Sequence, residues 1–291
     1  MQSRCNSKIG IFVPTLNAEK SIETIISAIN ESSLDLENLF VIDSESTDST
    51  VEILKKRGIA YRTVKREEFS HGRVRRDAIN HFRKQADFVI MLTQDVVFGA
   101  RELNKLVTGI VRREDVGVSY MRQVCTKKHT VEFLDRQFNY PKTSAIKNAA
   151  TISVLGPSTF FSSDAFAIYR VQAVISVGNF PANVDFSEDS YMAAKLVLAG
   201  WSVYYNADAK VIHNNIANYK ELYFRYRHIS EFFSDNQWLT KKFGSNYKKG
   251  IDLVKFELGQ AVSNLDAKLF LNVLIASSLK FIAYKLPNVR K

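Results

Sequence analysis

Residues 38–43 are Asn-Leu-Phe-Val-Ile-Asp, and residues 86–95 are Ala-Asp-Phe-Val-Ile-Met-Leu-Thr-Gln-Asp. Each stretch is a β-branched and aromatic run that ends on polar residues, which is typical of a buried parallel strand. Ligands of open α/β sheets bind just beyond the carboxyl ends of such strands. Asp43 and Asp95 are therefore expected at the ligand-binding edge of a sheet. Two carboxylates there suit a nucleotide diphosphate with its divalent metal.

Strand and helix patterns alternate along the first half of the chain, which favours a parallel sheet built of βαβ units. We expect strands at residues 9–13, 39–43, 59–64, 88–93 and 116–122, and helices at 18–30, 48–57, 74–85, 101–113 and 131–138. Further along we expect a strand at 160–168, helices at 171–176 and 187–199, and edge strands at 202–205 and 209–213. Beyond Tyr219 the pattern is helical.

Composition places the chain among folded globular proteins, because 46% of its 291 residues are hydrophobic and 12% are aromatic. The two cysteines, Cys5 and Cys125, have neither CxxC spacing nor nearby metal-ligand partners. A disulfide scaffold is therefore not expected, and a reducing cytoplasmic setting is. No apolar signal-peptide segment precedes the first expected strand, which agrees with that setting.

Three further residues carry candidate chemistry. His213 ends an expected strand and is either a core histidine or a nitrogen ligand completing a metal site with Asp95, which would admit Mn²⁺ beside Mg²⁺. Glu188 and Asp189 open an expected helix, where the helix dipole alone favours acidic residues. If that first turn faces the cleft, one of the two carboxylates is a ready general base.

The order of these motifs resembles that of the family-two glycosyltransferases of the GT-A fold. The motifs are Val13-Pro-Thr-Leu-Asn17, residues 41–50, Thr93-Gln-Asp95, Glu188-Asp189 and His213. The segment Phe69-Ser-His-Gly-Arg-Val-Arg75, the Thr-Gln-Asp triplet and the segments 160–170 and 177–181 look most like the rhamnosyltransferase branch. The resemblance implies an α/β fold with a Rossmann-like, mostly parallel sheet over residues 1–218. A C-terminal helical extension would follow over residues 219–291.

The resemblance also implies roles for individual residues. Asp189 would deprotonate the acceptor hydroxyl with Glu188 orienting it, and Asp95 would hold Mg²⁺ or Mn²⁺ with His213 as a further ligand. Pro14, Thr15 and Asp43 would border the nucleobase and ribose, and His71, Gly72 and Arg75 would contact the nucleotide and its phosphates. We assign Asn17, Ser44 and Gln94, which belong to the same motifs, to the donor site as well.

These roles describe an inverting glycosyltransferase. The expected donor is a nucleotide-diphosphate sugar, most simply dTDP-L-rhamnose, and the expected acceptor is a saccharide on a lipid-linked precursor of a cell-surface polysaccharide. One alternative is a UDP-hexose donor. Another, suggested by the net charge of +10, is a basic nucleic-acid-binding protein, but the charge lies in the tail rather than in interleaved basic and aromatic motifs. We therefore expect no nucleic-acid partner.

The C-terminal tail is basic and partly apolar. Residues 239–291 hold ten lysines and arginines against three acidic residues, and residues 269–279 are strongly apolar. That apolar run is shorter than the roughly 20 residues that span a membrane. It fits either an amphipathic helix on the inner face of the cell membrane or a helix packed on the domain. In the membrane interpretation Lys268, Lys280 and Lys285 would meet anionic lipid, together with Arg290 and Lys291, which lie outside the residues that the structure describes.

Overall fold

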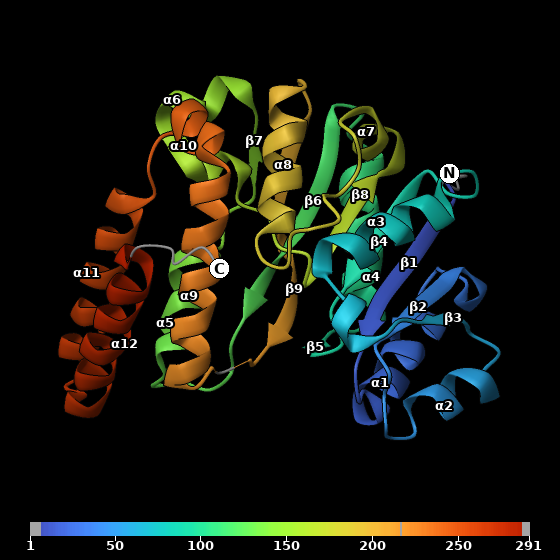
Figure 1. The fold of residues 1–291 in the computed structure, drawn as a ribbon, viewed down its shortest axis with the longest axis horizontal. Coiled ribbons are helices and arrows are strands. Elements are labelled where there is room, and N and C mark those ends of the chain that lie inside the picture. Colours follow the sequence, from blue (N-terminus) through green and yellow to red (C-terminus); the bar gives the residue numbers. More distant parts are fainter. Residues whose placement is uncertain (1–6, 216, 287–291) are drawn as a thin grey trace.

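The computed structural model describes residues 7–215 and 217–286 and contains one curled mixed sheet with helices on both faces (Figure 1). The strand order is β3-β2-β1-β4-β8-β6-β9-β5, and β7 pairs with the same edge of β9 as β5, nearer the start of that strand. The strands are β1 (Ile9–Thr15), β2 (Leu39–Asp43), β3 (Ala60–Thr63), β4 (Phe88–Leu92), β5 (Val96–Val97), β6 (Val116–Val124), β7 (Ala145–Lys147), β8 (Phe166–Arg170) and β9 (Ser202–His213).

The parallel strands bring the predicted polar residues to one edge of the sheet. β1, β2, β3 and β4 are mutually parallel neighbours, and β6 and β9 run parallel to each other. β8 is antiparallel to β4 and β6, with Phe166 opposite Leu92, so the chain enters β8 where β4 ends. The carboxyl ends of β2, β4, β6 and β9 and the start of β8 therefore share this edge.

Successive side chains of a strand point to opposite faces of the sheet, and both faces of this sheet carry apolar side chains. Helices therefore cover both faces. In β4, Val89 and Met91 join the core beneath α3, α7 and α8, whereas Ile90 and Leu92 join the core beneath α1 and α4. The helices of the first part are α1 (Glu19–Asn30), α2 (Thr50–Lys56), α3 (His71–Phe82), α4 (Ala100–Val111), α5 (Val131–Asn139), α6 (Ile152–Leu155), α7 (Val171–Ser176) and α8 (Glu188–Leu198).

Four helices follow at the C-terminal side: α9 (Tyr219–Asp235), α10 (Gln237–Phe243), α11 (Tyr247–Ser263) and α12 (Ala267–Lys285). Phe232 of α9 and Phe243 of α10 belong to the main core, so these two helices fold onto the sheet domain. α11 and α12 form a smaller apolar cluster with Leu134 of α5, at the end of the molecule opposite α1 and α2 (Figure 1).

The mixed α/β class is confirmed, but some predicted boundaries were wrong. The strand expected at 160–168 starts only at Phe166, because residues 156–160 form a 3₁₀ helix and residues 161–165 form a connecting loop. The two predicted edge strands are one interior strand, β9, whose pairing with β6 is irregular between Asn206 and Lys210. The helix expected from residue 74 begins at His71, after the Ser70 side chain accepts a hydrogen bond from the Arg73 backbone N–H.

The tail differs from the predicted amphipathic helix. α12 is 19 residues long, so by length and composition alone it could cross a membrane. Of its most apolar stretch of 18 residues, 28% is buried inside the protein. Its Lys280 is buried rather than exposed to lipid, and its Nζ lies 3.3 Å from a carboxylate oxygen of Asp135. Apolar residues such as Leu271 and Phe281 are instead exposed, with 57% and 56% of their surface accessible.

Candidate active site

The ends of β1 and β2 are joined by buried hydrogen bonds. Thr15 and Asp43 are register partners, and the Thr15 hydroxyl donates to Asp43 Oδ1 at 2.9 Å. The backbone N–H and hydroxyl of Ser46 also donate to the Asp43 carboxylate, and Ser44 donates through its N–H and hydroxyl to the Thr15 carbonyl. Asp43 is fully buried. Its hydrogen bonds hold together the ends of β1 and β2, where we predict the nucleotide to bind.

Two predicted donor-site residues hold the loop after β1. The Gln94 carboxamide oxygen accepts from the Leu16 N–H at 2.7 Å, and its NH₂ group donates to the Leu16 carbonyl at 2.9 Å. Asn17 has a φ of 52°, and its side-chain oxygen accepts from the Thr47 N–H. Pro14 pairs in register with Ile42 within the sheet. Gln94 therefore holds the loop after β1, and its assignment to the donor site stays a prediction.

Asp95 and His213, the predicted metal ligands, lie together just beyond β4 and at the end of β9. His213 Nε2 is 3.0 Å from Asp95 Oδ2, and the Asn215 carboxamide also reaches this oxygen at 3.3 Å. Two ligand atoms about 2.1 Å from one divalent ion, in adjacent octahedral positions, lie about 3.0 Å apart. The two side chains fit a shared cation. Within residues 7–215 and 217–286, no group of three or more His, Cys, Asp or Glu side chains could hold a metal, so the remaining ligands would come from substrate phosphates and water.

Gln123 sets the orientation of the His213 ring. Its carboxamide oxygen lies 2.8 Å from His213 Nδ1, and its NH₂ group donates to the Ser163 hydroxyl at 2.6 Å. With Nδ1 turned toward Gln123, Nε2 faces Asp95 and is the ring nitrogen available to a metal. Burial raises the pKa of Asp95, but the hydrogen bond and charge of His213 outweigh it and hold this pKa well below its usual range. The carboxylate is therefore ionised at neutral pH.

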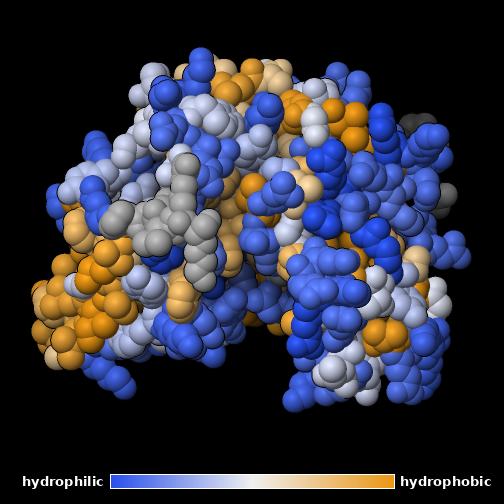
Figure 2. Space-filling model, in the orientation of Figure 1, coloured by the Kyte–Doolittle hydropathy of each residue, from blue (hydrophilic) through white to orange (hydrophobic). Residues whose placement is uncertain are grey.

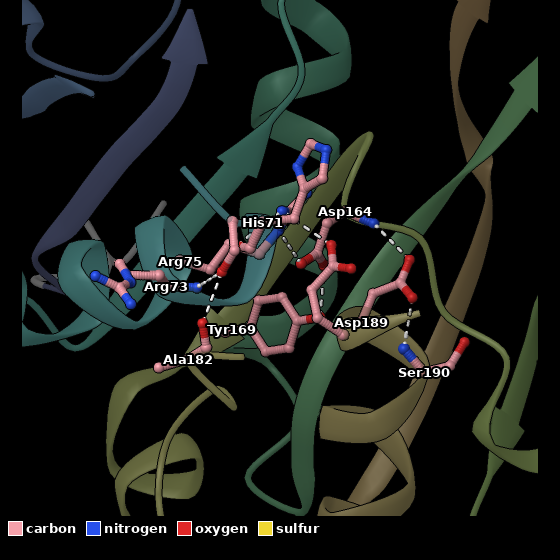
Figure 3. A network of polar contacts seen from close by, with 10 residues as sticks. His71, Arg73, Arg75, Asp164, Tyr169, Ala182, Asp189 and Ser190 are labelled. Carbon is pink, nitrogen blue, oxygen red and sulfur yellow. Dashed lines mark hydrogen bonds and ion pairs between the residues drawn. The ribbon is translucent and has the colours of Figure 1, made fainter. Parts of the chain in front are cut away.

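A second cluster surrounds Asp189 at the first turn of α8 (Figure 3). The Arg75 guanidinium is buried and pairs with Asp164 at 2.6 Å and with Glu188 at 2.9 Å. Asp164 also accepts from the Tyr169 hydroxyl at 2.5 Å. The Asp189 carboxylate accepts from the Ser190 backbone N–H at 2.6 Å and faces the Asp164 N–H at 3.4 Å, so the backbone fixes its position.

This cluster raises the pKa of both acids that open α8. Burial and the nearby Asp164 carboxylate raise the pKa of Asp189 to about 6, although Arg75 opposes the change. Burial raises the pKa of Glu188 to about 8 against the effect of Arg75, helped by Asp189 and Asp164. Asp189 is partly accessible whereas Glu188 is buried. Asp189 is therefore the carboxylate that can reach a substrate, and its pKa suits a general base near neutral pH.

The predicted phosphate contacts of the α3 segment receive other partners. Arg75 is committed to the two buried carboxylates, and the Gly72 N–H donates to the Val184 carbonyl at 2.9 Å. A Cβ on Gly72 would lie 1.9 Å from the Pro181 carbonyl oxygen, so glycine permits this close packing. His71 packs edge-on against Phe69, and burial together with Arg75 lowers its pKa to about 3. These contacts fix the segment against the first turn of α8, and its contacts with the nucleotide and phosphates stay a prediction.

The structure adds Asp164, Tyr169, Gln123 and Ser46 to the site. Asp164 and Tyr169 lie in the segment Phe160-Phe-Ser-Ser-Asp-Ala-Phe-Ala-Ile-Tyr-Arg170, which carried part of the resemblance, but nothing in its spacing indicated a pairing with Arg75. The neighbouring Ser163 and Asp164 connect the two clusters, because Ser163 bonds Gln123 and Asp164 faces Asp189. The Asp95–His213 pair and Asp189 thus belong to one edge of the sheet.

Comparisons with known proteins identify the family of this chain. Residues 10–178 match the model of the family described as glycosyl transferase family 2. The chain is 30% identical over 282 residues to the O-antigen chain rhamnosyltransferase RfbN of Salmonella typhimurium, covering 96% of this chain and 89% of RfbN. It is also 30% identical to the O-antigen chain rhamnosyltransferase WbaN of Salmonella anatum, covering 95% of this chain and 88% of WbaN.

A solved structure has the same fold. The mannosyltransferase PcManGT from Pyrobaculum calidifontis, in complex with GDP-Man and Mn²⁺, aligns with a TM-score of 0.61 at 15% identity. The alignment covers 96% of this chain and 87% of that one. At this identity the likeness concerns the fold alone, and it extends through the C-terminal helices.

Proposed function

Because the chain belongs to glycosyl transferase family 2, we propose that it transfers L-rhamnose from dTDP-L-rhamnose to a saccharide, with inversion at the anomeric carbon. The observation that carries the choice of sugar is the 30% identity to two O-antigen chain rhamnosyltransferases over nearly the whole chain. The geometry that supports the reaction type is one accessible carboxylate with a raised pKa, at the same sheet edge as a metal-ligand pair.

In the proposed reaction Asp189 accepts the proton of the acceptor hydroxyl as its oxygen attacks the anomeric carbon. The bond from that carbon to the diphosphate oxygen breaks, and its electron pair leaves with the nucleotide diphosphate. Glu188, Arg75 and Asp164 act as positioning residues, because they fix the first turn of α8 without reaching the substrate. A positioned general base contributes about 10²–10⁴-fold to such a rate.

Asp95 and His213 are the proposed ligands of a divalent cation, Mg²⁺ or Mn²⁺. When bound, the cation would neutralise charge on the leaving diphosphate. Gln123 holds the His213 ring for this role. The nucleoside would lie along the loops after β1 and β2, where we propose that it is bordered by Pro14, Thr15, Asn17, Asp43 and Ser44.

We further propose that the acceptor saccharide is linked to a lipid and that the enzyme works at the cytoplasmic face of the cell membrane. Exposed apolar side chains on α12 support this, among them Leu271, Leu274, Phe281 and Ile282. Figure 2 shows an orange, apolar surface at the lower left, where Figure 1 places α11 and α12. In this proposal residues 1–218 form the catalytic domain and residues 219–291 hold it at the membrane.

The direct experiment measures nucleotide diphosphate release from a panel of donors in the presence of Mn²⁺ and a lipid-linked saccharide extract. The panel contains dTDP-L-rhamnose, UDP-glucose and GDP-mannose. We expect turnover with dTDP-L-rhamnose at least about tenfold above the other two. Preference for UDP-glucose would replace the donor by a UDP-hexose, and no release from any donor would contradict the transferase proposal.

A further inference from the structure

A cavity of about 200 Å³ lies between α5, the segment after β9, α9 and α12. One side reaches Asn215, whose carboxamide contacts the proposed metal ligand Asp95. The opposite side is lined by Asn272 and Ala276 of α12, the helix with the exposed apolar residues. The cavity thus connects the metal-ligand end of the site with the proposed membrane helix. We call it the arginine cavity, because Arg136 of α5 and Arg225 of α9 line it.

Arg136 lies beside the proposed metal ligand His213 and has an N–H group without a hydrogen-bond acceptor in the described residues. Its Nη2 lies 3.2 Å from His213 Nδ1, although Gln123 occupies that ring nitrogen at the shorter distance of 2.8 Å. Its Nε is buried and has no hydrogen-bond partner in the described part of the chain. The guanidinium also lies 5.7 Å from the centre of the Tyr140 ring, which holds it in place. The Arg136 guanidinium is therefore a permanent positive charge that no carboxylate of the described residues neutralises.

The remaining charges around the cavity leave a positive excess. Arg225, like Arg136, forms no ion pair with a carboxylate of residues 7–215 and 217–286. Of the acidic side chains in the wall, Asp135 pairs with Lys280, which leaves Glu132 against the two arginines. Lys280 also faces the buried Glu257 at 3.9 Å, and burial raises the pKa of Glu257 to about 8, so that this group is mostly protonated at pH 7. His129 in the wall pairs with Asp266 at 2.9 Å. The side chains thus leave a net cationic site lined by polar groups.

We propose that the arginine cavity binds a phosphate-type anion of a substrate through Arg136 and Arg225. Guanidinium groups recognise phosphate oxygens by paired, charge-assisted hydrogen bonds, which is the chemistry that these side chains leave unsatisfied. The inference deepens the proposed function, on which it rests. Two substrates of that reaction offer the group: the diphosphate of the nucleotide-sugar donor and the diphosphate of a lipid-linked acceptor.

The test uses the full-length protein and inorganic pyrophosphate in EDTA, so that no metal contributes, with binding measured by calorimetry. Arg136→Gln and Arg225→Gln remove one cation each, and Arg136→Lys keeps the charge. Arg101→Gln is the matched control, because Arg101 is an exposed arginine on α4, away from the cavity. We expect each cavity Gln variant to weaken pyrophosphate binding at least about tenfold and Arg101→Gln to stay within about threefold of wild type. Arg136→Lys should lose less than Arg136→Gln, because it keeps the charge but not the paired donors.

Unchanged pyrophosphate affinity in both cavity variants, or an equal loss in Arg101→Gln, would overturn the proposal. A second arm finds the source of the anion by comparing dTDP with Mn²⁺ and farnesyl diphosphate in EDTA. Loss of dTDP affinity in Arg136→Gln assigns the cavity to the donor. Retained dTDP affinity with loss of farnesyl diphosphate binding assigns it to the acceptor lipid. Both binding measurements are independent of turnover, so their failure is distinguishable from failure of the transferase proposal.

Discussion

Replacing Arg75 by methionine should destabilise the protein in a pH-dependent way. The substitution keeps an unbranched side chain but removes the cation between Asp164 and Glu188, which are 1% and 6% exposed. Removing one partner of a buried ion pair costs about 3–5 kcal/mol, because the other charge stays buried without compensation. Against a total stability of about 5–15 kcal/mol, the variant should remain folded near pH 5.

The sign of the pH effect follows from the raised pKa values. Glu188 already has a pKa of about 8 in the folded state, and burial also raises that of Asp164. Without Arg75 both rise further, so the folded state keeps protons that the unfolded state releases. The free energy of unfolding that such groups support is fully present below the pKa that they have in the unfolded chain. Above that pKa it falls as pH rises, by up to about 1.4 kcal/mol per pH unit for each group.

The assay is urea unfolding followed by circular dichroism at pH 5 and pH 8. We expect Arg75→Met to lower the free energy of unfolding by about 3–5 kcal/mol at pH 8 and by clearly less at pH 5. Adding Glu188→Gln to this variant should restore part of the lost stability at pH 8. Arg73→Met, on the exposed side of the same helix, is the control. A loss in Arg75→Met no larger than in Arg73→Met, or the same loss at both pH values, would refute the reasoning.

Three other predictions follow from the site and the tail. Asp95→Asn should abolish the Mn²⁺-dependent part of dTDP binding measured by calorimetry, and unchanged binding would remove Asp95 from the metal site. Gly72→Ala should lower the free energy of unfolding in urea by about 2 kcal/mol or more, because its Cβ would lie 1.9 Å from the Pro181 carbonyl oxygen; a loss below about 0.5 kcal/mol would contradict this packing. Leu271→Ser combined with Phe281→Ser should weaken flotation with anionic vesicles at least about tenfold, since both side chains are more than half exposed, and equal flotation would mean that α12 does not face the bilayer.

The alternating part of the fold follows from the sequence because local signals agree with the final packing there. Residues 88–92 are apolar throughout and form the fully buried β4, and the polar residues after them mark its end. The carboxyl edge with Asp43, Asp95 and His213 follows from the same pattern, since parallel strands bring their ends together. The proximity of Asp95 and His213 was predicted, whereas their metal-binding role stays a proposal.

The rest depends on contacts between distant residues. The short strands β5 and β7 exist because β9 offers edges to pair with, and nothing local marks them. Arg75 looked like a phosphate ligand, but only the folded chain brings it to Asp164 and Glu188, 89 and 113 residues further along. The sequence likewise predicted Lys280 to be a surface lysine. In the folded chain α12 packs against α5, and Lys280 pairs with Asp135.

The role of Asp189 is tested most directly by the turnover of Asp189→Asn with dTDP-L-rhamnose and acceptor at pH 7.5, with the Kd for dTDP measured on the same preparation. The substitution keeps the shape of the side chain and, through its remaining oxygen, the contact with the Ser190 backbone N–H, but it replaces the oxygen that faces the Asp164 N–H at 3.4 Å by an NH₂ group and removes the ability to take a proton. The account predicts that kcat falls by about 10²–10⁴-fold while the Kd stays within about twofold of wild type. A kcat within a few-fold of wild type would show that Asp189 is not the general base.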